Sequence, residues 1–397
     1  MAEWIECRIS DIGTVVGGAT PSTKKAENYN GGEIAWITPK DLSSFRGRYI
    51  KHGERNITEV GLKNCSTQLL PKNTVLFSSR APIGYVAIAS NELCTNQGFK
   101  SVIPNKNTDP LFLFYLLKYN KKVIEGMGSG TTFKEVSGNV MKNVMVRVPK
   151  SKTIQEKLAT ILGSIDDKIE ENERINDNLE QQMQVLFNEY LSSNKFYDLT
   201  TVENVVLSAN TGADAIQKAP IVDYDTGIRC IRVGDMTNNR SFHDWGFTKV
   251  TDDVFKRYQL HKDDIVVTRT ASLGLNTIIP EDLPAVYNNG LIRLTVNTSN
   301  VLPLYLFRQF QTEDFSNYIA CIESETSVRP NMKIKYLLKY EFVLPPITKQ
   351  NEIIALLTPM LNQQNNLIVE NKHLEALRDT LLPKLMSGEL DVSKIDL

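Results

Sequence analysis

The chain has 397 residues, 41% of them hydrophobic, which is enough for two or three domains with buried cores. No apolar run approaches the roughly 18 residues of a membrane span, and the N-terminus lacks the apolar core of a signal peptide. The formal charge is −1, but residues 1–150 carry 20 Lys and Arg against 12 Asp and Glu, whereas residues 151–198 carry 5 against 10. The basic first block suits a polyanion, and the acidic second block does not.

Residues 1–149 are predicted to form a first globular domain of short strands separated by turns. Three β-type runs, at 34–37, 75–77 and 85–89, are bounded by Gly, Pro and Asn. Residues 110–118 are typical of a short helix. The spacing of these elements predicts a mixed α/β domain.

Residues 150–194 are predicted to be a helical spacer. Apolar residues recur at steps of three and four from Leu158 to Tyr190, with no proline in that stretch. A helix over 153–191 would be about 58 Å long at 1.5 Å per residue. Thr153, with Glu156 three residues later, fits a capping box at its start. So narrow a stripe indicates one partner helix, as in a coiled coil.

The second half of the chain repeats the first. A second domain is predicted at 195–345 and a second helical spacer with a tail at 346–397. Gln155 aligns with Gln350 at an offset of 195, and 75–84 aligns with 265–274 at an offset of 190. The repeat predicts a pseudo-twofold arrangement with antiparallel helices. The second stripe is expected to consist of Ile353, Leu356, Met360, Leu367, Leu374, Leu377, Leu381 and Leu385.

Signs of catalysis are absent from the sequence. An N6-adenine methyltransferase would show an Asn/Asp-Pro-Pro-aromatic loop, but Asp109-Pro110-Leu111-Phe112 lacks the second proline and indicates a helix start. No Walker A phosphate loop occurs. The five cysteines have no metal or redox spacing and fit a reducing cytoplasm. These observations predict a binding protein without chemistry of its own.

Several phrases in this order resemble the DNA-specificity (S) subunit of type I restriction–modification systems. They are residues 37–42 (ITPKDL), 79–84 (SRAPIG), 96–99 (NQGF), 148–149 (VP), 155–158 (QEKL) and 381–390 (LLPKLMSGEL). The resemblance implies an α+β fold in which two similar mixed α/β target-recognition domains are separated by a long antiparallel two-helix coiled coil. Each domain would read one half of a bipartite site in double-stranded DNA.

The same resemblance implies partners and places the cofactors on them. The helices would set the spacing between the half-sites and dock two methyltransferase subunits, and restriction (translocase/nuclease) subunits would then join. S-adenosylmethionine is expected on the methyltransferase subunits, and ATP and Mg on the restriction subunit. No cofactor and no metal is expected on this chain, which would be non-catalytic.

Candidate DNA contacts are side chains with donor and acceptor patterns suited to bases or phosphates. In the first domain they are Lys24, Lys25, Lys40, Ser79, Arg80, Gln97, Lys100, Thr132 and Lys134, and in the second Arg232, Arg269, Thr270, Asn289, Arg293, Arg329 and Asn331. Arg80 and Arg269 are favoured because they recur in matching loops.

Two other functions stay open on the sequence alone. A structural adaptor could use the helix pair to bridge proteins, but it would leave the duplicated loops with Arg and Lys unexplained. An enzyme with a hidden nuclease centre would cleave DNA without partners when a metal is supplied.

Overall fold

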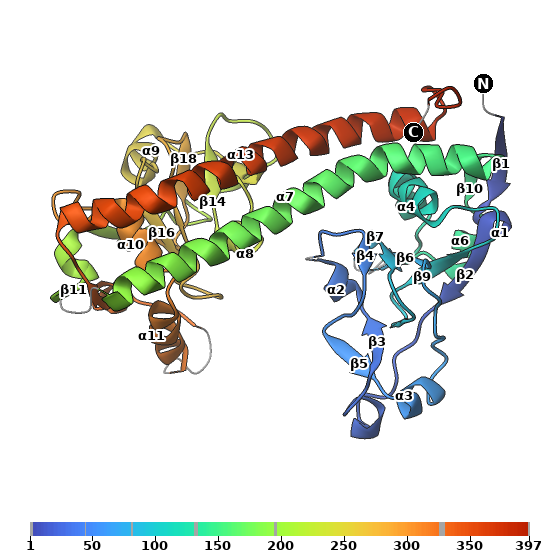
Figure 1. Cartoon of the computed structure of the whole chain (residues 1–397), viewed down its shortest axis with the longest axis horizontal. Helices are drawn as coiled ribbons and strands as arrows, with labels where there is room; N and C mark the ends of the chain where they lie inside the picture. The colour runs from blue at the N-terminus through green and yellow to red at the C-terminus, as the bar shows by residue number, and fades with distance from the viewer. Residues whose placement is uncertain are drawn as a thin grey trace. The chain divides into compact units, whose positions relative to one another are not determined.

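The computed structural model describes residues 3–43, 45–80, 82–130, 134–193, 197–324 and 330–395. The chain divides into two units, Met1–Arg174 with Asn366–Leu397, and Ile175–Asn365. The two long helices, α7 (Lys152–Ser193) and α13 (Ile347–Met386), are the green and red helices of Figure 1, and each contributes half of its length to each unit. Each unit therefore contains one globule and a segment of both helices.

The globule of the first unit contains two sheets and a ribbon. A ribbon joins β1 (Trp4–Arg8) to β10 (Met145–Pro149) in antiparallel register. The five-stranded sheet has the order β2 (Gly13–Gly17), β9 (Lys100–Pro104), β6 (Val75–Ser79), β7 (Ile83–Ala89) and β4 (Tyr49–Ile50). The three-stranded sheet has the order β5 (Arg55–Ile57), β3 (Ile34–Ile37) and β8 (Cys94–Thr95). Its helices are α1 (Ile9–Ile12), η1 (Ala26–Asn28), α2 (Pro39–Ser43), α3 (Glu59–Lys63), α4 (Pro110–Tyr119), α5 (Lys121–Gly126) and α6 (Gly138–Asn143).

The globule of the second unit has the same plan. Its ribbon pairs β11 (Leu199–Thr201) with β20 (Glu341–Val343). One sheet has the order β12 (Val206–Thr211), β19 (Leu291–Val296), β16 (Ile265–Thr268) and β17 (Asn276–Ile278). The other has the order β13 (Ile221–Val222), β15 (Gly246–Thr248), β14 (Arg229–Ile231) and β18 (Ala285–Tyr287). Its helices are η2 (Val202–Val205), α8 (Val233–Thr237), η3 (Phe242–Asp244), α9 (Asp252–Tyr258), α10 (Pro303–Gln309), α11 (Glu313–Ser324) and α12 (Ile334–Leu338).

The sheet orders confirm the internal repeat and the α+β fold class. The order β2-β9-β6-β7 corresponds to β12-β19-β16-β17, and β5-β3-β8 corresponds to β15-β14-β18. In both small sheets the last pair is parallel, while its neighbour is antiparallel. A shared mixture of parallel and antiparallel pairs indicates one ancestral topology in two copies.

In each unit, one core cluster lies between a sheet and the long helices. In the first unit, α4 buries six consecutive residues, Phe112 to Leu117, because the sheet covers one side and α7 the other. Leu158 and Leu162 of α7 complete that core. In the second unit, Tyr305 of α10 packs with Met183 and Phe187 of α7. Burial of this kind contributes about 25 cal/mol per Å² of apolar surface.

A buried glutamine fastens the start of each long helix. Gln155 donates to the Pro149 carbonyl at 3.0 Å and accepts from the Asp109 amide at 3.0 Å. Gln350 repeats both bonds, to the Pro345 carbonyl at 2.8 Å and from the Leu302 amide at 2.8 Å. The predicted capping box at Thr153 is wrong, because α7 already begins at Lys152 and Thr153 lies inside the helix.

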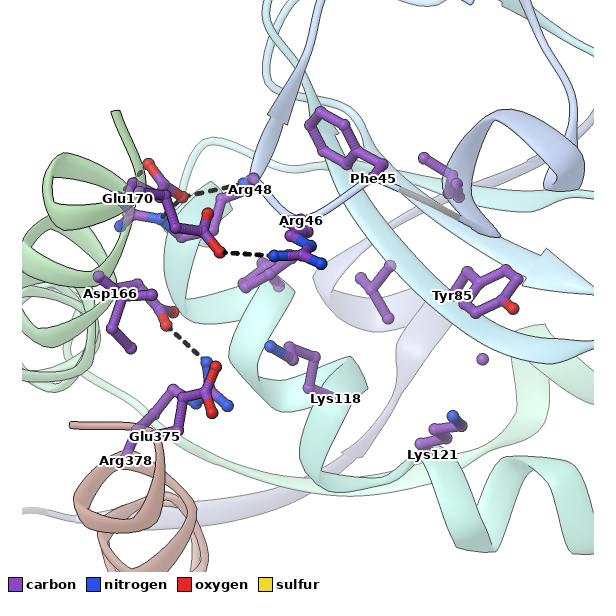
Figure 2. Close-up of a pocket in the computed structure, with 17 residues that line it drawn as sticks. Phe45, Arg46, Arg48, Tyr85, Lys118, Lys121, Asp166, Glu170, Glu375 and Arg378 are labelled. Atoms are coloured by element: carbon purple, nitrogen blue, oxygen red, sulfur yellow. Dashed lines mark hydrogen bonds and ion pairs between the residues drawn. The ribbon is translucent and has the colours of Figure 1, made fainter. Parts of the chain in front are cut away.

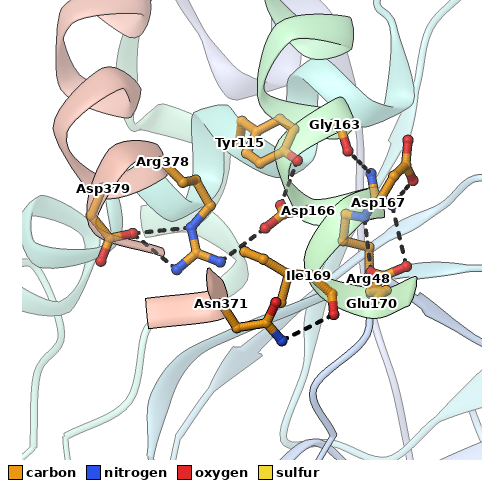
Figure 3. A network of polar contacts seen from close by, with 10 residues as sticks. All are labelled: Arg48, Tyr115, Gly163, Asp166, Asp167, Ile169, Glu170, Asn371, Arg378 and Asp379. Atoms are coloured by element: carbon orange, nitrogen blue, oxygen red, sulfur yellow. Dashed lines mark hydrogen bonds and ion pairs between the residues drawn. The ribbon is translucent and has the colours of Figure 1, made fainter. Parts of the chain in front are cut away.

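Within the first unit, the two long helices run antiparallel through a polar seam. Arg378 Nη1 donates to Asp166 Oδ1 at 2.9 Å (Figure 3). Asn172 Nδ2 donates to Asn371 Oδ1 at 2.8 Å. Asn371 donates in turn to the Ile169 carbonyl at 3.3 Å. Rising numbers on α7 meet falling numbers on α13, which is the signature of antiparallel packing.

The second unit shows the same antiparallel sense. Gln364 Nε2 donates to the Asn176 carbonyl at 3.0 Å, and the Tyr190 hydroxyl donates to the Lys349 carbonyl at 2.9 Å. Two members of the expected stripe on α13 are wrong, since Leu356 is 63% exposed and Leu377 is 48% exposed. Gln364, Asn371 and Arg378, spaced by seven residues, face α7 instead.

An arginine attaches the first globule to α7. The Arg48 side chain is 6% exposed and donates to Glu170 Oε1 at 3.0 Å, to the Gly163 carbonyl at 3.2 Å and to Asp167 (Figure 3). Burial alone would lower the pKa of Arg48, but the hydrogen bonds to Glu170 and Asp167 outweigh burial and raise it. The charged guanidinium of Arg48 therefore joins the first globule to α7.

Candidate nucleic-acid interface

Three turns meet at one edge of the first globule. The Asn96 amide donates to the Ile37 carbonyl at 2.9 Å, which joins the β8–β9 turn to the end of β3. The Ser79 amide donates to the Gly98 carbonyl at 2.7 Å, which joins the same turn to the β6–β7 turn. Gly98 permits this approach, since a Cβ there would lie 2.7 Å from Pro39 Cγ. Backbone bonds thus fix the edge from which side chains project.

Opposite charges share this edge. Glu135 Oε1 lies 3.3 Å from Lys100 Nζ, and its other oxygen lies 3.9 Å from Arg80 Nη1. Arg80 is partly exposed, and an ion pair at 3.9 Å in solvent stabilises by less than about 1 kcal/mol. The guanidinium of Arg80 can therefore exchange Glu135 for a base edge or a phosphate at small cost.

Other predicted residues of the first domain surround the edge or lie away from it. Gln97 is exposed and accepts a hydrogen bond from Thr20, while Lys40 bonds Glu54 at 2.8 Å, which raises the pKa of Lys40. Lys134 is exposed beside Glu135. Lys24 and Lys25 are exposed on the loop before η1, and the start of that loop is joined to the β8–β9 turn through the bond from Thr20 to Gln97. Thr132 lies outside the described residues.

Ser79 does not keep its predicted role. It is fully buried, and its hydroxyl donates to the Gly98 carbonyl at 3.1 Å. Its side chain therefore closes the two turns and presents no surface to DNA. Sequence alone could not separate it from the exposed neighbour Arg80, because a strand end alternates faces within one residue.

The second globule builds the same edge with other side chains. The Asn288 amide donates to the Ile231 carbonyl at 3.2 Å, and the Arg269 amide donates to the Gly290 carbonyl at 2.9 Å. Gly84 and Gly274 sit at matching positions after the turn, with φ of 92° and 79°. The backbone frame is conserved between the two globules, and the side chains on it differ.

Arg80 and Arg269 lie in matching loops, as predicted, but one position apart. Arg80 bridges Glu135 through its backbone, and Thr270 bridges Asn331 in the same way. Arg269 therefore matches Ser79, and both close the turn. Three of its guanidinium donors bind the Met332 carbonyl, the Asn289 carbonyl and Asn331 Oδ1, at 3.1, 3.1 and 2.7 Å.

The remaining candidates of the second domain divide into surface and interior positions. Asn289 and Asn331 are exposed, and Thr270 is half-buried beside them. Arg232 is partly exposed and pairs with buried Asp235 at 3.3 Å. Arg293 is interior: it donates to the Gln259 carbonyl at 2.6 Å and lies over the Tyr287 ring, so its predicted DNA contact is not supported. Arg329 lies outside the described residues.

Sequence reasoning missed the acidic partners of this edge. Glu135 pairs with Lys100 and Arg80, and Asp235 pairs with Arg232 and Arg240. Residues 34–42 align with 228–236 at an offset of 194, which places Asp235 opposite Asp41, and each of these carboxylates accepts the amide of the residue three positions before it. The alignment of Asp41 with Asp235 was the feature of the sequence that could have identified Asp235 as such a partner.

Asp109, the acidic residue of the phrase that was compared with a methyltransferase loop, has a structural role. Asp109 caps α4 by accepting the Phe112 amide at 2.7 Å, as its sequence context predicted. Among the described residues, no group of three His, Cys, Asp or Glu side chains could hold a metal ion. Within the same part of the chain, no helix is long and apolar enough to cross a membrane.

Comparison with known proteins decides the family. A family model described as the type I restriction modification DNA specificity domain matches residues 1–181 and 204–376. The chain belongs to this family. Each match covers one globule and the greater part of the helix that follows it, so this specificity-family chain contains the domain twice.

Relatives span the full length. The MjaIX specificity subunit of Methanocaldococcus jannaschii is 31% identical over 431 residues, covering 99% of this chain and 95% of the relative. The MjaVIII specificity subunit of the same organism is 19% identical over 417 residues, covering 99% and 94%. A crystal structure of a type I restriction–modification S subunit from M. genitalium superposes with a TM-score of 0.54 at 15% identity, covering 99% and 97%. That structure shows the same fold.

Proposed function

We propose that this specificity-family chain binds double-stranded DNA at a split, asymmetric site, with one globule on each half. The supporting observation is the repeated edge: both globules hold three turns by equivalent backbone bonds, yet Arg80 stands where the other has Thr270. A common frame with different side chains suits two modules that read different bases. Linking two weak modules raises affinity through effective concentration.

The chain acts in this proposal as a non-catalytic platform for methyltransferase and restriction subunits. Its α13 helix carries several apolar side chains that are exposed to solvent. Exposed apolar side chains on a helix suit the docking of helices from a partner protein. These exposed residues are Leu356, Ile368, Val369 and Leu377. Two methyltransferase subunits would bind S-adenosylmethionine, and ATP with Mg would bind the restriction subunit.

The long helices set the distance between the half-sites in this proposal. Because α7 and α13 are each one unbroken helix of 42 and 40 residues, their length scales with residue number. The buried polar contacts on their seam fix one register, as single polar positions do in coiled coils.

The deciding experiment is methylome sequencing of a host that expresses this chain with its methyltransferase subunit. The expected result is adenine methylation within two different short sequences separated by a fixed gap. A single continuous palindrome would contradict the two-module reading. Methylation or metal-dependent cleavage by the purified chain alone would contradict its non-catalytic role.

A further inference from the structure

A cavity of about 420 Å³ lies in the first unit, outside the three-turn edge. Figure 2 shows its walls: the start of β7, the loop between α2 and β4, the end of α4, and facing segments of α7 and α13. The volume falls within the range of small-ligand sites. Its lining includes five basic side chains, four carboxylates and three aromatic rings.

Lys118 is the unusual residue of this cavity. Its ammonium lies 5.1 Å from the centre of the Phe114 ring and has no carboxylate within 4.0 Å among the described residues. Burial, followed by the positive charge of Arg378, lowers the pKa of Lys118. Lys118 is half-buried, and Asp166 and Asp379 act against the lowering of its pKa, but neither carboxylate pairs with its ammonium, so a bound anion would be stabilising here.

The other charges of the lining are already matched or lie at the mouth. Arg48 is paired with Glu170, and Arg378 is paired with Asp166 at 2.9 Å. Arg46 is 57% exposed and only 3.5 Å from Glu173, a pair that can rearrange at little cost. Lys121 and Glu375 are exposed at the rim. The central charge left without a partner is therefore positive.

The cavity shares a wall with the candidate interface. Gly84, with φ of 92°, follows the β6–β7 turn that carries Arg80, and it lies against the stem of Lys121. A Cβ at Gly84 would lie 2.5 Å from Lys121 Cγ, so the glycine keeps this wall thin.

We infer that this cavity binds a phosphate group of the DNA backbone, held by Lys118 with Arg46 and Lys121 at its mouth. The inference rests on the proposed function. Phosphate contacts position a protein on DNA without reading sequence. A free nucleotide offers the same chemistry, and the experiment separates the two sources.

The contact belongs to the first globule alone. Pro110 and Pro303 begin matching helices, and the same offset places Gln311 opposite Lys118. Gln311 is neutral and donates to Asn276 Oδ1 at 2.5 Å. The second globule therefore lacks the corresponding cation, and the phosphate contact makes the two halves unequal.

The test measures DNA binding by the chain in complex with its methyltransferase subunits, from about 50 to 200 mM salt. Lys118→Gln is compared with Lys122→Gln, which removes a charge from an exposed position on α5 outside the cavity. Lys118→Gln is expected to weaken binding to cognate and random duplexes alike and to reduce the slope of log K against log salt by about 0.9. Lys122→Gln should keep the wild-type slope, and Lys118→Arg should restore it.

A second arm titrates the same complexes with ATP and with inorganic phosphate and follows thermal stability. Stabilisation of wild type but not of Lys118→Gln, with an unchanged salt slope, would overturn the DNA source and assign the cavity to a free nucleotide. Equal slopes for all variants and no such stabilisation overturn the phosphate site. If the wild-type complex does not prefer its split motif over random DNA, the proposed function is refuted. The salt slopes of wild type and Lys118→Gln on random DNA still show in that case whether the cavity binds a backbone phosphate.

Discussion

Replacing Arg48 with methionine should loosen the first globule from α7. The substitution keeps an apolar stem in a position that is 6% exposed and removes the bonds to Glu170, Asp167 and the Gly163 carbonyl. Hydrogen bonds to charged groups contribute about 1.5–3 kcal/mol each. Asp167 is 70% exposed, so water hydrates its carboxylate when the bond to Arg48 is lost. Most of the expected loss of stability therefore comes from the bonds to Glu170 and to the Gly163 carbonyl. The expected loss is about 2–4 kcal/mol, below the upper values for a fully buried ion pair.

The assay is urea unfolding followed by tryptophan fluorescence of the first unit alone. Trp36 lies in β3 of the first globule, with its indole bonded to the Ala19 carbonyl at 3.1 Å. With Trp4 and Trp245 replaced by phenylalanine, Trp36 reports this unit separately, which matters because a two-unit chain need not unfold in one step. The matched control is Arg174→Met, which breaks an exposed pair with Glu171.

The Arg174 variant should leave the unfolding midpoint close to the wild-type value, because exposed ion pairs contribute little to stability. If Arg48→Met lowered the unfolding midpoint no more than this control, the reasoning that Arg48 fastens the globule to α7 would be refuted.

Three further outcomes are expected. Arg80→Ala should weaken DNA binding through the first half-site only, by roughly 1–3 kcal/mol if Arg80 contacts a base. Arg269→Ala should also lower thermal stability, because the Arg269 guanidinium closes a turn. Equal melting temperatures of the two variants would contradict this distinction. Inserting four residues into both long helices should lengthen the methylated spacer by about one to two base pairs, since it adds roughly 6 Å, and an active mutant with the original spacer would show that the helices do not measure the gap. Gly388→Ala should destabilise more than Gly227→Ala, because both have positive φ but only Gly388 would place a Cβ 2.8 Å from Trp4; denaturation of both variants checks the order.

Features with a local or periodic cause could be predicted from the sequence. The long helices, the repeat offset and the cap at Asp109 follow from spacing and from residue types next to one another. The seam of α13 was only partly predictable. Leu356 and Leu377 fit a helical period as well as Gln364 and Arg378, and only the position of α7 decides which face is inside.

The interface shows the same division. Matching phrases located the turns, but a one-residue difference in register separates buried Ser79 from Arg80 and makes Arg269 a turn-closing residue. The cavity around Lys118 could not be foreseen, because its walls come from segments as distant as β7 and α13. Long-range contacts of this kind have no signature in the neighbouring sequence.

The ribbons at the base of each globule have an evolutionary consequence. The chain runs into the first globule through β1 and out through β10, and these strands are hydrogen-bonded neighbours; β11 and β20 do the same for the second. Both ends of each globule thus lie at one place, next to the glutamine that fastens the first turn of the following helix. Genetic recombination at these junctions could replace a whole globule, and with it half of the recognised sequence, while the helices that follow keep their starting points.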